Sequence, residues 1–256
     1  MQRNHLLQPG RAFLLVLALL VPAACGSGPA QQGAAPTPTS RMPLTPTTIP
    51  VPSTLVHFTT QDHVRLAGLL YGHGGMTAIV CSHMWPSSKA DWLAAAPWLA
   101  ARGFLVLAYD FRGLGDSQGQ ADFFQLDKDL MAAIAFVQSM GAEKVVLLGA
   151  SGGGAITLKV AAKVRVAAVI TLSADYFAAA PTEQEVLAIT APKLFVSSHN
   201  DAYIHDTMQL FKWAKQPKEL YLYPGSAHGT NLFETEYRQD LIERIIAFTE
   251  RYASLQ

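Results

Sequence analysis

The ten residues from Val145 to Gly154, VVLLGASGGG, are the most informative stretch of this sequence. They join a short apolar run, typical of a strand buried on both faces, to the pattern G-x-S-x-G and then to a helical pattern over Gly152–Lys163. A tight turn from strand to helix strains its central residue and raises that side chain above the sheet, and glycines beside it leave room for neighbouring elements. The pattern therefore predicts Ser151 as a nucleophile. The alternative is a glycine-rich turn whose serine caps a helix.

From residue 54 onward, strand patterns alternate with helix patterns. Eight segments have strand character: Val56–Thr60, Val64–Tyr71, Thr77–Ser82, Phe104–Tyr109, Val145–Leu148, Val166–Leu172, Lys193–Ser197 and Leu220–Tyr223. Five have helical character: Ser88–Ala101, Leu126–Met140, Gly152–Lys163, Thr207–Ala214 and Glu234–Tyr252. This alternation predicts an α/β domain with a mostly parallel sheet of about eight strands, helices on both faces and an antiparallel hairpin at one edge.

Two further side chains complete a pattern for nucleophilic catalysis. Asp201 follows the strand that begins at Lys193 and lies 50 residues after Ser151, and His228 follows the last strand, 27 residues later. A serine hydroxyl is a weak nucleophile until a base takes its proton, and an acid must hold that imidazole in one tautomer. We therefore predict Ser151 as nucleophile, His228 as base and Asp201 as orienting acid. Asp175, just after the strand Val166–Leu172, is the alternative acid.

With these segments the chain resembles the α/β-hydrolase superfamily, from about residue 54 to its end. The resemblance rests on four segments: G-A-S-G-G at 149–153, Asn200–Asp201, G-S-A-H-G at 225–229, and D-F-R-G-L-G-D-S-Q-G at 110–119. It implies the α/β-hydrolase fold without a separate lid domain, in keeping with the short segment of about 20 residues between Leu172 and Lys193. It also implies serine-hydrolase chemistry of the lidless esterase or dienelactone hydrolase type, with no metal and no cofactor.

The resemblance also assigns roles to loop residues. The oxyanion hole is expected to combine the backbone amides of Gly152 and Met84, where Met84 occupies the position of a glycine that is common in the family. Asp110, Arg112 and Asp116 belong to the 110–119 loop, which is architectural in the family, and are expected to be structural.

The expected activity is hydrolysis of a small carboxylic ester through an acyl-enzyme on Ser151. Two alternatives remain open: a serine peptidase or amidase of the same fold, and a non-catalytic exported protein that binds a ligand. Four aromatic residues are candidates for the pocket wall, although core packing explains them equally well: Trp85, Trp92, Tyr176 and Phe177.

Composition excludes some functions. The 19 basic and 19 acidic residues balance, and no run of Lys and Arg marks a nucleic-acid surface. The two cysteines, Cys25 and Cys81, have neither a disulfide pattern nor the spacing of metal ligands. Cys81 lies in an apolar run and is expected to be a small core residue.

The N-terminus predicts export. Residues 1–24 carry basic residues and then an apolar run of ten, Ala12–Val21, which is too short to span a bilayer comfortably. With Cys25 they resemble a bacterial lipoprotein signal, except that Pro22 stands where an aliphatic residue is usual. Residues 25–53 are rich in Pro and Thr and predict a tether between a lipid on Cys25 and a domain over 54–256. An ordinary secreted protein and an uncleaved anchor are the alternatives.

Overall fold

The computed structural model describes residues 51–73, 76–176 and 180–254. The predicted signal peptide at 1–24, Cys25 and the predicted tether up to residue 50 lie outside the described residues. Within the described part, no helix is long and apolar enough to cross a bilayer.

One sheet of eight strands organises the domain, in the order β1-β2-β4-β3-β5-β6-β7-β8. The strands are β1 (Ser53–Thr59), β2 (Arg65–Tyr71), β3 (Thr77–Ser82), β4 (Leu105–Tyr109), β5 (Lys144–Ala150), β6 (Ala168–Leu172), β7 (Lys193–Ser198) and β8 (Lys218–Tyr223). β1 and β2 pair antiparallel and form the edge hairpin, whereas β4, β3 and β5 to β8 pair in parallel. The predicted fold class, a mostly parallel sheet of eight strands, is confirmed.

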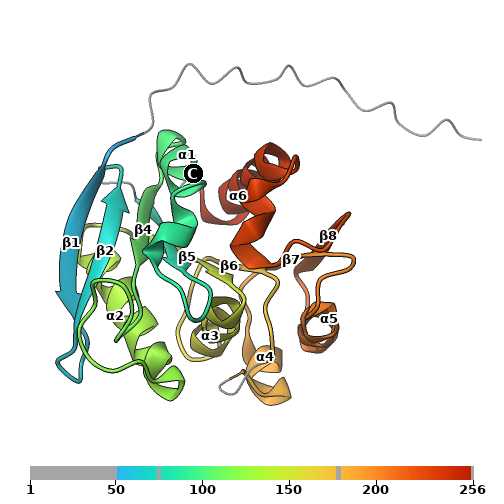
Figure 1. Ribbon diagram of the computed structural model, residues 1–256, viewed down its shortest axis with the longest axis horizontal. Coiled ribbons are helices and arrows are strands. Elements are labelled where there is room, and N and C mark those ends of the chain that lie inside the picture. The colour runs from blue at the N-terminus through green and yellow to red at the C-terminus, as the bar shows by residue number, and fades with distance from the viewer. Residues whose placement is uncertain (1–50, 74–75, 177–179, 255–256) are drawn as a thin grey trace, which may run out of the picture. The chain divides into compact units, whose positions relative to one another are not determined.

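Helices cover both faces of this sheet (Figure 1). One face carries α2 (Leu126–Ser139), α3 (Gly152–Ala161), α4 (Glu183–Ala188) and α5 (Ile204–Trp213), and the other carries α1 (Ala96–Ala101) and α6 (Arg238–Ala253). Alternate strand residues face the two layers: in β3, Ala78 and Val80 join one apolar cluster while Ile79 and Cys81 join the other. Cys81 is fully buried there, as expected.

The predicted helix over 88–101 is two shorter elements. A 3-10 helix, η1 (Lys89–Trp92), is capped by the Ser88 hydroxyl, which accepts the Ala90 amide at 3.3 Å. α1 starts anew at Ala96, with Pro97 in its first turn. Proline fits only the first turn of a helix because it has no N–H to donate, so the helical pattern is interrupted before it.

The segment between β6 and β7 holds one short helix among its described residues, α4. This helix is not among the elements that the sequence pattern predicts. Its signal was present: the Thr182 hydroxyl accepts the Glu185 amide and the Glu185 side chain accepts the Thr182 amide, a capping box.

Candidate functional site

Four loops meet at the carboxyl-terminal edge of the parallel strands. Ser151 follows β5 directly, Asp175 follows β6, Asp201 follows β7 and His228 follows β8. Because parallel strands all end at the same edge, residues far apart in the sequence gather there.

Ser151 lies in a strained turn between β5 and α3. Its backbone has φ 52° and ψ −126°, a region that a residue with a side chain adopts only when its surroundings impose it. The flanking glycines are required by contact: a Cβ on Gly149 would lie 2.4 Å from the Gly153 carbonyl oxygen, and a Cβ on Gly153 would lie 2.3 Å from the His83 carbonyl oxygen. The backbone that the sequence pattern predicted for this turn is therefore present, and for the reason given.

The predicted nucleophile, base and acid form one hydrogen-bonded line. His228 Nε2 is 2.8 Å from Ser151 Oγ, and His228 Nδ1 is 3.0 Å from both carboxylate oxygens of Asp201. Ser151 and Asp201 are nearly buried, at 5% and 3% exposure. An imidazole held by a carboxylate at Nδ1 presents a free Nε2 to the hydroxyl, which is the arrangement that general-base catalysis needs.

The surroundings of Asp201 favour its charged form. Burial by itself raises the pKa of this carboxyl, but hydrogen bonds from His228, Ser173 and the Tyr203 amide outweigh it and hold the pKa below its usual value of 3.8. The Tyr203 amide donates to Oδ1 at 2.8 Å and the Ser197 hydroxyl to Oδ2 at 3.2 Å. Asp201 is thus ionised and fixed in orientation.

Asp175, the alternative acid, contacts the nucleophile. Its Oδ2 accepts a hydrogen bond from Ser151 Oγ at 2.9 Å, and the residue is 8% exposed. Ser151 Oγ therefore has a carboxylate on one side and an imidazole on the other, but it carries a single proton to donate.

The loop after β3 differs from the expectation that the Met84 amide is a free oxyanion donor. The Met84 amide donates to Asp91 Oδ2 at 3.1 Å, so it is engaged within the protein and the structure does not support it as an oxyanion donor. The next residue, Trp85, lies against the nucleophile turn, since a Cβ on Gly152 would be 3.2 Å from Trp85 Cβ. Among the hydrogen bonds of the described residues, neither the Trp85 amide nor the Gly152 amide has an acceptor.

His83 and Lys89 fix this loop. The Phe111 amide donates to His83 Nε2 at 3.0 Å, so the ring proton is on Nδ1 and donates to the Met84 carbonyl at 2.6 Å. Burial lowers the pKa of His83, in keeping with this neutral ring. The Lys89 ammonium donates to Asp110 and to Asp116, at 2.6 Å each. These contacts give His83 a structural role and support the structural role expected of Asp110 and Asp116.

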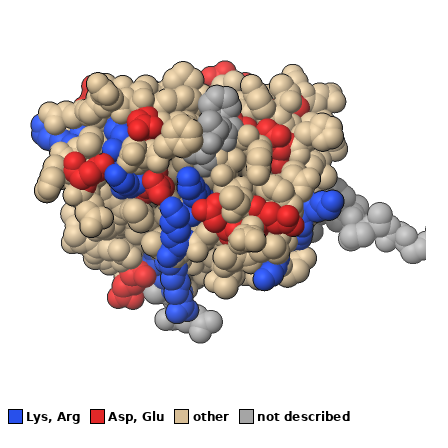
Figure 2. All heavy atoms as spheres, turned by 90° about the horizontal axis from the view of Figure 1, so that it is seen from below, with Lys and Arg blue, Asp and Glu red and all other residues tan. Residues whose placement is uncertain are grey.

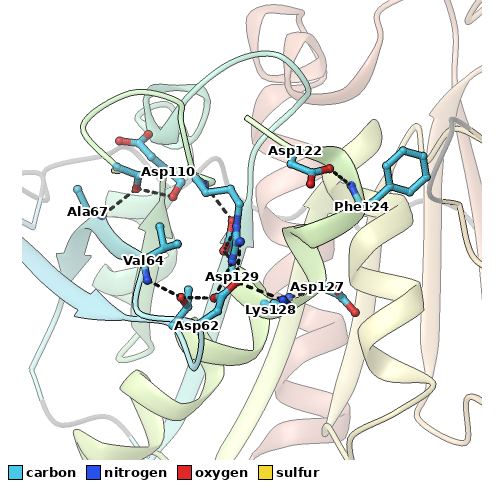
Figure 3. Close-up of polar contacts among 12 residues, drawn as sticks. Asp62, Val64, Ala67, Asp110, Asp122, Phe124, Asp127, Lys128 and Asp129 are labelled. Atoms are coloured by element: carbon cyan, nitrogen blue, oxygen red, sulfur yellow. Dashed lines mark hydrogen bonds and ion pairs between the residues drawn. The ribbon is translucent and has the colours of Figure 1, made fainter. Parts of the chain in front are cut away.

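Arg112 also has a structural role. Its guanidinium donates to Asp129 in α2 at 2.6 and 2.8 Å and to both carboxylate oxygens of Asp62 at 2.9 and 3.1 Å. Figure 3 shows Asp62, at the turn between β1 and β2, reaching toward Asp129 and Lys128 of α2. The network ties the edge hairpin to the helical layer.

Two exposed aromatic side chains neighbour residues of this site. Tyr176 directly follows Asp175 and packs edge-on against Trp213, and the Tyr203 ring centroid is 5.0 Å from that of His228. The Trp85 ring packs edge-on against Phe123 at 5.3 Å. Trp92, also a pocket candidate, is fully buried against Phe233 and belongs to the core. Phe177 lies outside the described residues.

Among the residues that the structure describes, metal ligation gives no second candidate site. Within 51–73, 76–176 and 180–254, no group of three or more His, Cys, Asp and Glu side chains could hold a metal ion. Figure 2 shows Lys and Arg interspersed with Asp and Glu on the face that lies below in Figure 1. A hollow of about 520 Å³ lies at the amino ends of β5 to β7, lined by residues such as Glu143 and Arg165, at the sheet edge opposite Ser151.

A family model and several known proteins are similar to parts of this chain. A family model for the alpha/beta hydrolase fold matches residues 77–196. A non-heme chloroperoxidase from Burkholderia pyrrocinia is 33% identical over 98 residues, which are 38% of this chain and 35% of that protein. The bifunctional esterase/perhydrolase DCH from Acinetobacter calcoaceticus is 33% identical over 98 residues, 38% of this chain and 36% of that protein. The match thus spans about a third of the length of these relatives.

A solved structure is similar over a longer range. The esterase Pf2001 from Pyrococcus furiosus superposes with a TM-score of 0.69 at 18% identity, over 80% of this chain and 94% of that one. At this identity the likeness concerns the fold.

Proposed function

Since the chain has the α/β-hydrolase fold, we propose that it is a serine hydrolase that cleaves carboxylic esters with Ser151, His228 and Asp201. One observation carries the proposal: the continuous hydrogen-bonded line from the Asp201 carboxylate through the His228 ring to Ser151 Oγ, which ends on a strained serine at the edge of the sheet.

The first half of the reaction forms an acyl-enzyme. His228 Nε2 takes the hydroxyl proton while Ser151 Oγ bonds to the ester carbonyl carbon, and the carbonyl oxygen becomes an oxyanion. The amides of Gly152 and Trp85 are the proposed donors to that oxyanion, each contributing about 2.7–4 kcal/mol to stabilising the transition state. His228 then returns the proton to the leaving alkoxide oxygen as the carbon–oxygen bond breaks.

The second half repeats these steps with water. His228 takes a proton from water as the water oxygen attacks the acyl carbon, and then protonates Ser151 Oγ as the carboxylic acid leaves. Asp201 stays ionised throughout and stabilises the imidazolium, since its hydrogen bonds keep its pKa low.

Small esters are the proposed substrates. Among the described residues, the segment between β6 and β7 forms only α4, and the exposed Tyr176 and Tyr203 neighbour Asp175 and His228. The word esterase in the names of the Acinetobacter calcoaceticus and Pyrococcus furiosus proteins supports the same substrate class.

A fluorophosphonate probe tests the proposal. It should label the native protein and not Ser151→Ala, while Ser139→Ala, at an exposed serine of α2, should label like the native protein. Failure of the native protein to label, with the fold intact by circular dichroism, would contradict the hydrolase and favour the non-catalytic ligand-binding protein.

For the N-terminal segment we propose export and lipidation of Cys25. The support is the sequence pattern alone: an apolar run followed by Ala23, Ala24 and Cys25. Mass spectrometry after expression in a bacterial host should find a mature chain that begins with acylated Cys25, and Cys25→Ser should abolish the lipid. A native chain without lipid would exclude the anchor.

A further inference from the structure

We propose that Asp175 determines substrate specificity, and that its carboxylate selects esters carrying a cationic group over neutral or anionic ones. The inference rests on the proposed ester hydrolysis and names the substrate class of that site. Its central observation is the 2.9 Å hydrogen bond between Ser151 Oγ and Asp175 Oδ2.

This distance limits where the substrate can lie. Once Oγ is bonded to the carbonyl carbon at about 1.4 Å, that carbon is no more than about 4.3 Å from Asp175 Oδ2, and the atoms attached to it are within about 6 Å. Both the acyl and the alcohol side of an ester therefore begin in the immediate field of this carboxylate. An opposite charge placed near this point is attracted strongly, because little water screens a nearly buried group.

Neighbouring charges add to the negative field. Asp201 lies at the end of the next strand, and Asp206, in the first turn of α5, accepts the Tyr176 amide at 3.0 Å. His228 is the titratable base between these groups and is engaged by Asp201. A carboxylate group on the substrate would meet like charges here, which disfavours anionic esters.

Two exposed tyrosines beside the site suit an organic cation. Tyr203 and Tyr176 are 48% and 47% exposed, and they flank His228 and Asp175 respectively. Aromatic faces attract quaternary ammonium groups without requiring hydrogen-bond donors from them. Substrates with a trimethylammonium group near the carbonyl fit this combination of carboxylate and rings.

The same contact links recognition to activation. Ser151 Oγ lies 2.9 Å from Asp175 Oδ2 and 2.8 Å from His228 Nε2, and its single proton can be donated to only one of them at a time. A substrate cation that pairs with Asp175 competes for that carboxylate and releases the hydroxyl to donate to His228. The preference should then appear in kcat/KM and not only in KM.

Pairs of esters that match in shape and differ in charge test the proposal. On the acyl side, p-nitrophenyl 3-(trimethylammonio)propanoate is compared with 4,4-dimethylpentanoate and with the anionic hemisuccinate. On the alcohol side, choline butyrate is compared with 3,3-dimethylbutyl butyrate. In the acyl-side comparison, the alcohol-side comparison or both, we expect kcat/KM to be roughly 10- to 100-fold higher for the cationic ester than for its neutral isostere. The anionic hemisuccinate should be the slowest substrate.

Asp175→Asn keeps the shape and removes the charge, so the preference should fall to within about 2-fold. Glu219→Gln removes the same charge at the start of β8, at the opposite end of the sheet, and should keep the native preference. If Asp175→Asn does not fold, Asp175→Ser removes the same charge with a smaller polar side chain and should lose the preference to the same extent.

Two results would overturn the proposal: a native enzyme that treats cationic and neutral isosteres alike in both arms, or a preference that survives in Asp175→Asn. The rates at which phosphorothiolates inactivate Ser151 distinguish failure of this specificity proposal from failure of the proposed hydrolase function. Diethyl phosphorothiolates with trimethylammonioethyl or 3,3-dimethylbutyl thiol groups need only a reactive Ser151, so the charge preference is measured even if no ester turns over. A protein that no phosphonate or phosphorothiolate modifies lacks the hydrolase function, and with it the basis of this inference.

Discussion

Asp175 and Asp201 are the same residue type at equivalent places on neighbouring strands, yet they contact different partners. Each lies three residues after the end of its strand, β6 for Asp175 and β7 for Asp201, and both are nearly buried. Asp201 binds the His228 ring, whereas Asp175 binds the Ser151 hydroxyl. The difference follows from strand order: β6 lies beside β5, which leads directly into Ser151, and β7 lies beside β8, which ends five residues before His228. The neighbouring strand, and not the residue type, decides which partner each carboxylate meets.

The largest expected effect separates the two acids directly. On a neutral p-nitrophenyl ester, Asp201→Asn should lower kcat about 10⁴-fold, because an amide no longer holds the imidazole in the tautomer that leaves Nε2 free. Asp175→Asn should change it less than about 10-fold, since the line from Asp201 to Ser151 is intact. Steady-state kinetics on both variants measure the contrast.

The double variant tests whether Asp175 can replace Asp201. If it cannot, adding Asp175→Asn to Asp201→Asn should cost little further activity. A mild loss in Asp201→Asn together with a severe loss in Asp175→Asn would reverse the assignment of the two acids.

The sequence predicts most of what depends on local pattern. The apolar run before Ser151 predicts a strand buried on both faces, and sterics require the glycines around Ser151; the structure bears both out. The order of serine, acid and histidine along the chain also predicts which side chains come together, namely Ser151, Asp201 and His228. It favoured Asp201 as the acid but left Asp175 as an alternative, because both follow a buried strand and only the order of strands in the sheet separates them.

The loop after β3 shows where local pattern fails. Whether the Met84 amide is free depends on Asp91, seven residues away, which turns back through η1 and accepts that amide. Nothing in the residue types around Met84 signals this contact. By contrast, α4 could have been found from Thr182 and Glu185, whose spacing is that of a capping box.

Asp91 is a third carboxylate at this edge, and it acts on a backbone amide instead of a reacting atom. Its two oxygens accept the Met84 amide at 3.1 Å and the Ser87 hydroxyl at 2.6 Å, which holds the loop carrying Trp85. Asp91→Ala should lower kcat about 10-fold with little change in KM, because a displaced oxyanion donor weakens transition-state binding. Asp91→Asn keeps an acceptor for the amide and should retain most of the activity. Unchanged kcat in a folded Asp91→Ala protein would show that the contacts of Asp91 with Met84 and Ser87 do not position the oxyanion hole.

The smallest expected effect is on the stability of the folded protein at acid pH, and it depends on the Asp201 carboxylate. Its pKa is below the usual 3.8 in the folded protein, so between the two values the unfolded chain binds more protons and the free energy of unfolding rises with pH. The contribution of Asp201 is therefore complete above pH 3.8 and is lost as the pH falls through the folded value. Urea unfolding between pH 2.5 and 5 should show the free energy of unfolding rising less steeply with pH in Asp201→Asn than in the native protein. Glu219→Gln, which removes an exposed ion-pair partner of Arg251, serves as the control for charge loss. Equal slopes in native and Asp201→Asn proteins would mean that the contacts from His228, Ser173 and Tyr203 do not stabilise the ionised carboxylate, and the distinction between the two acids would then rest on position alone.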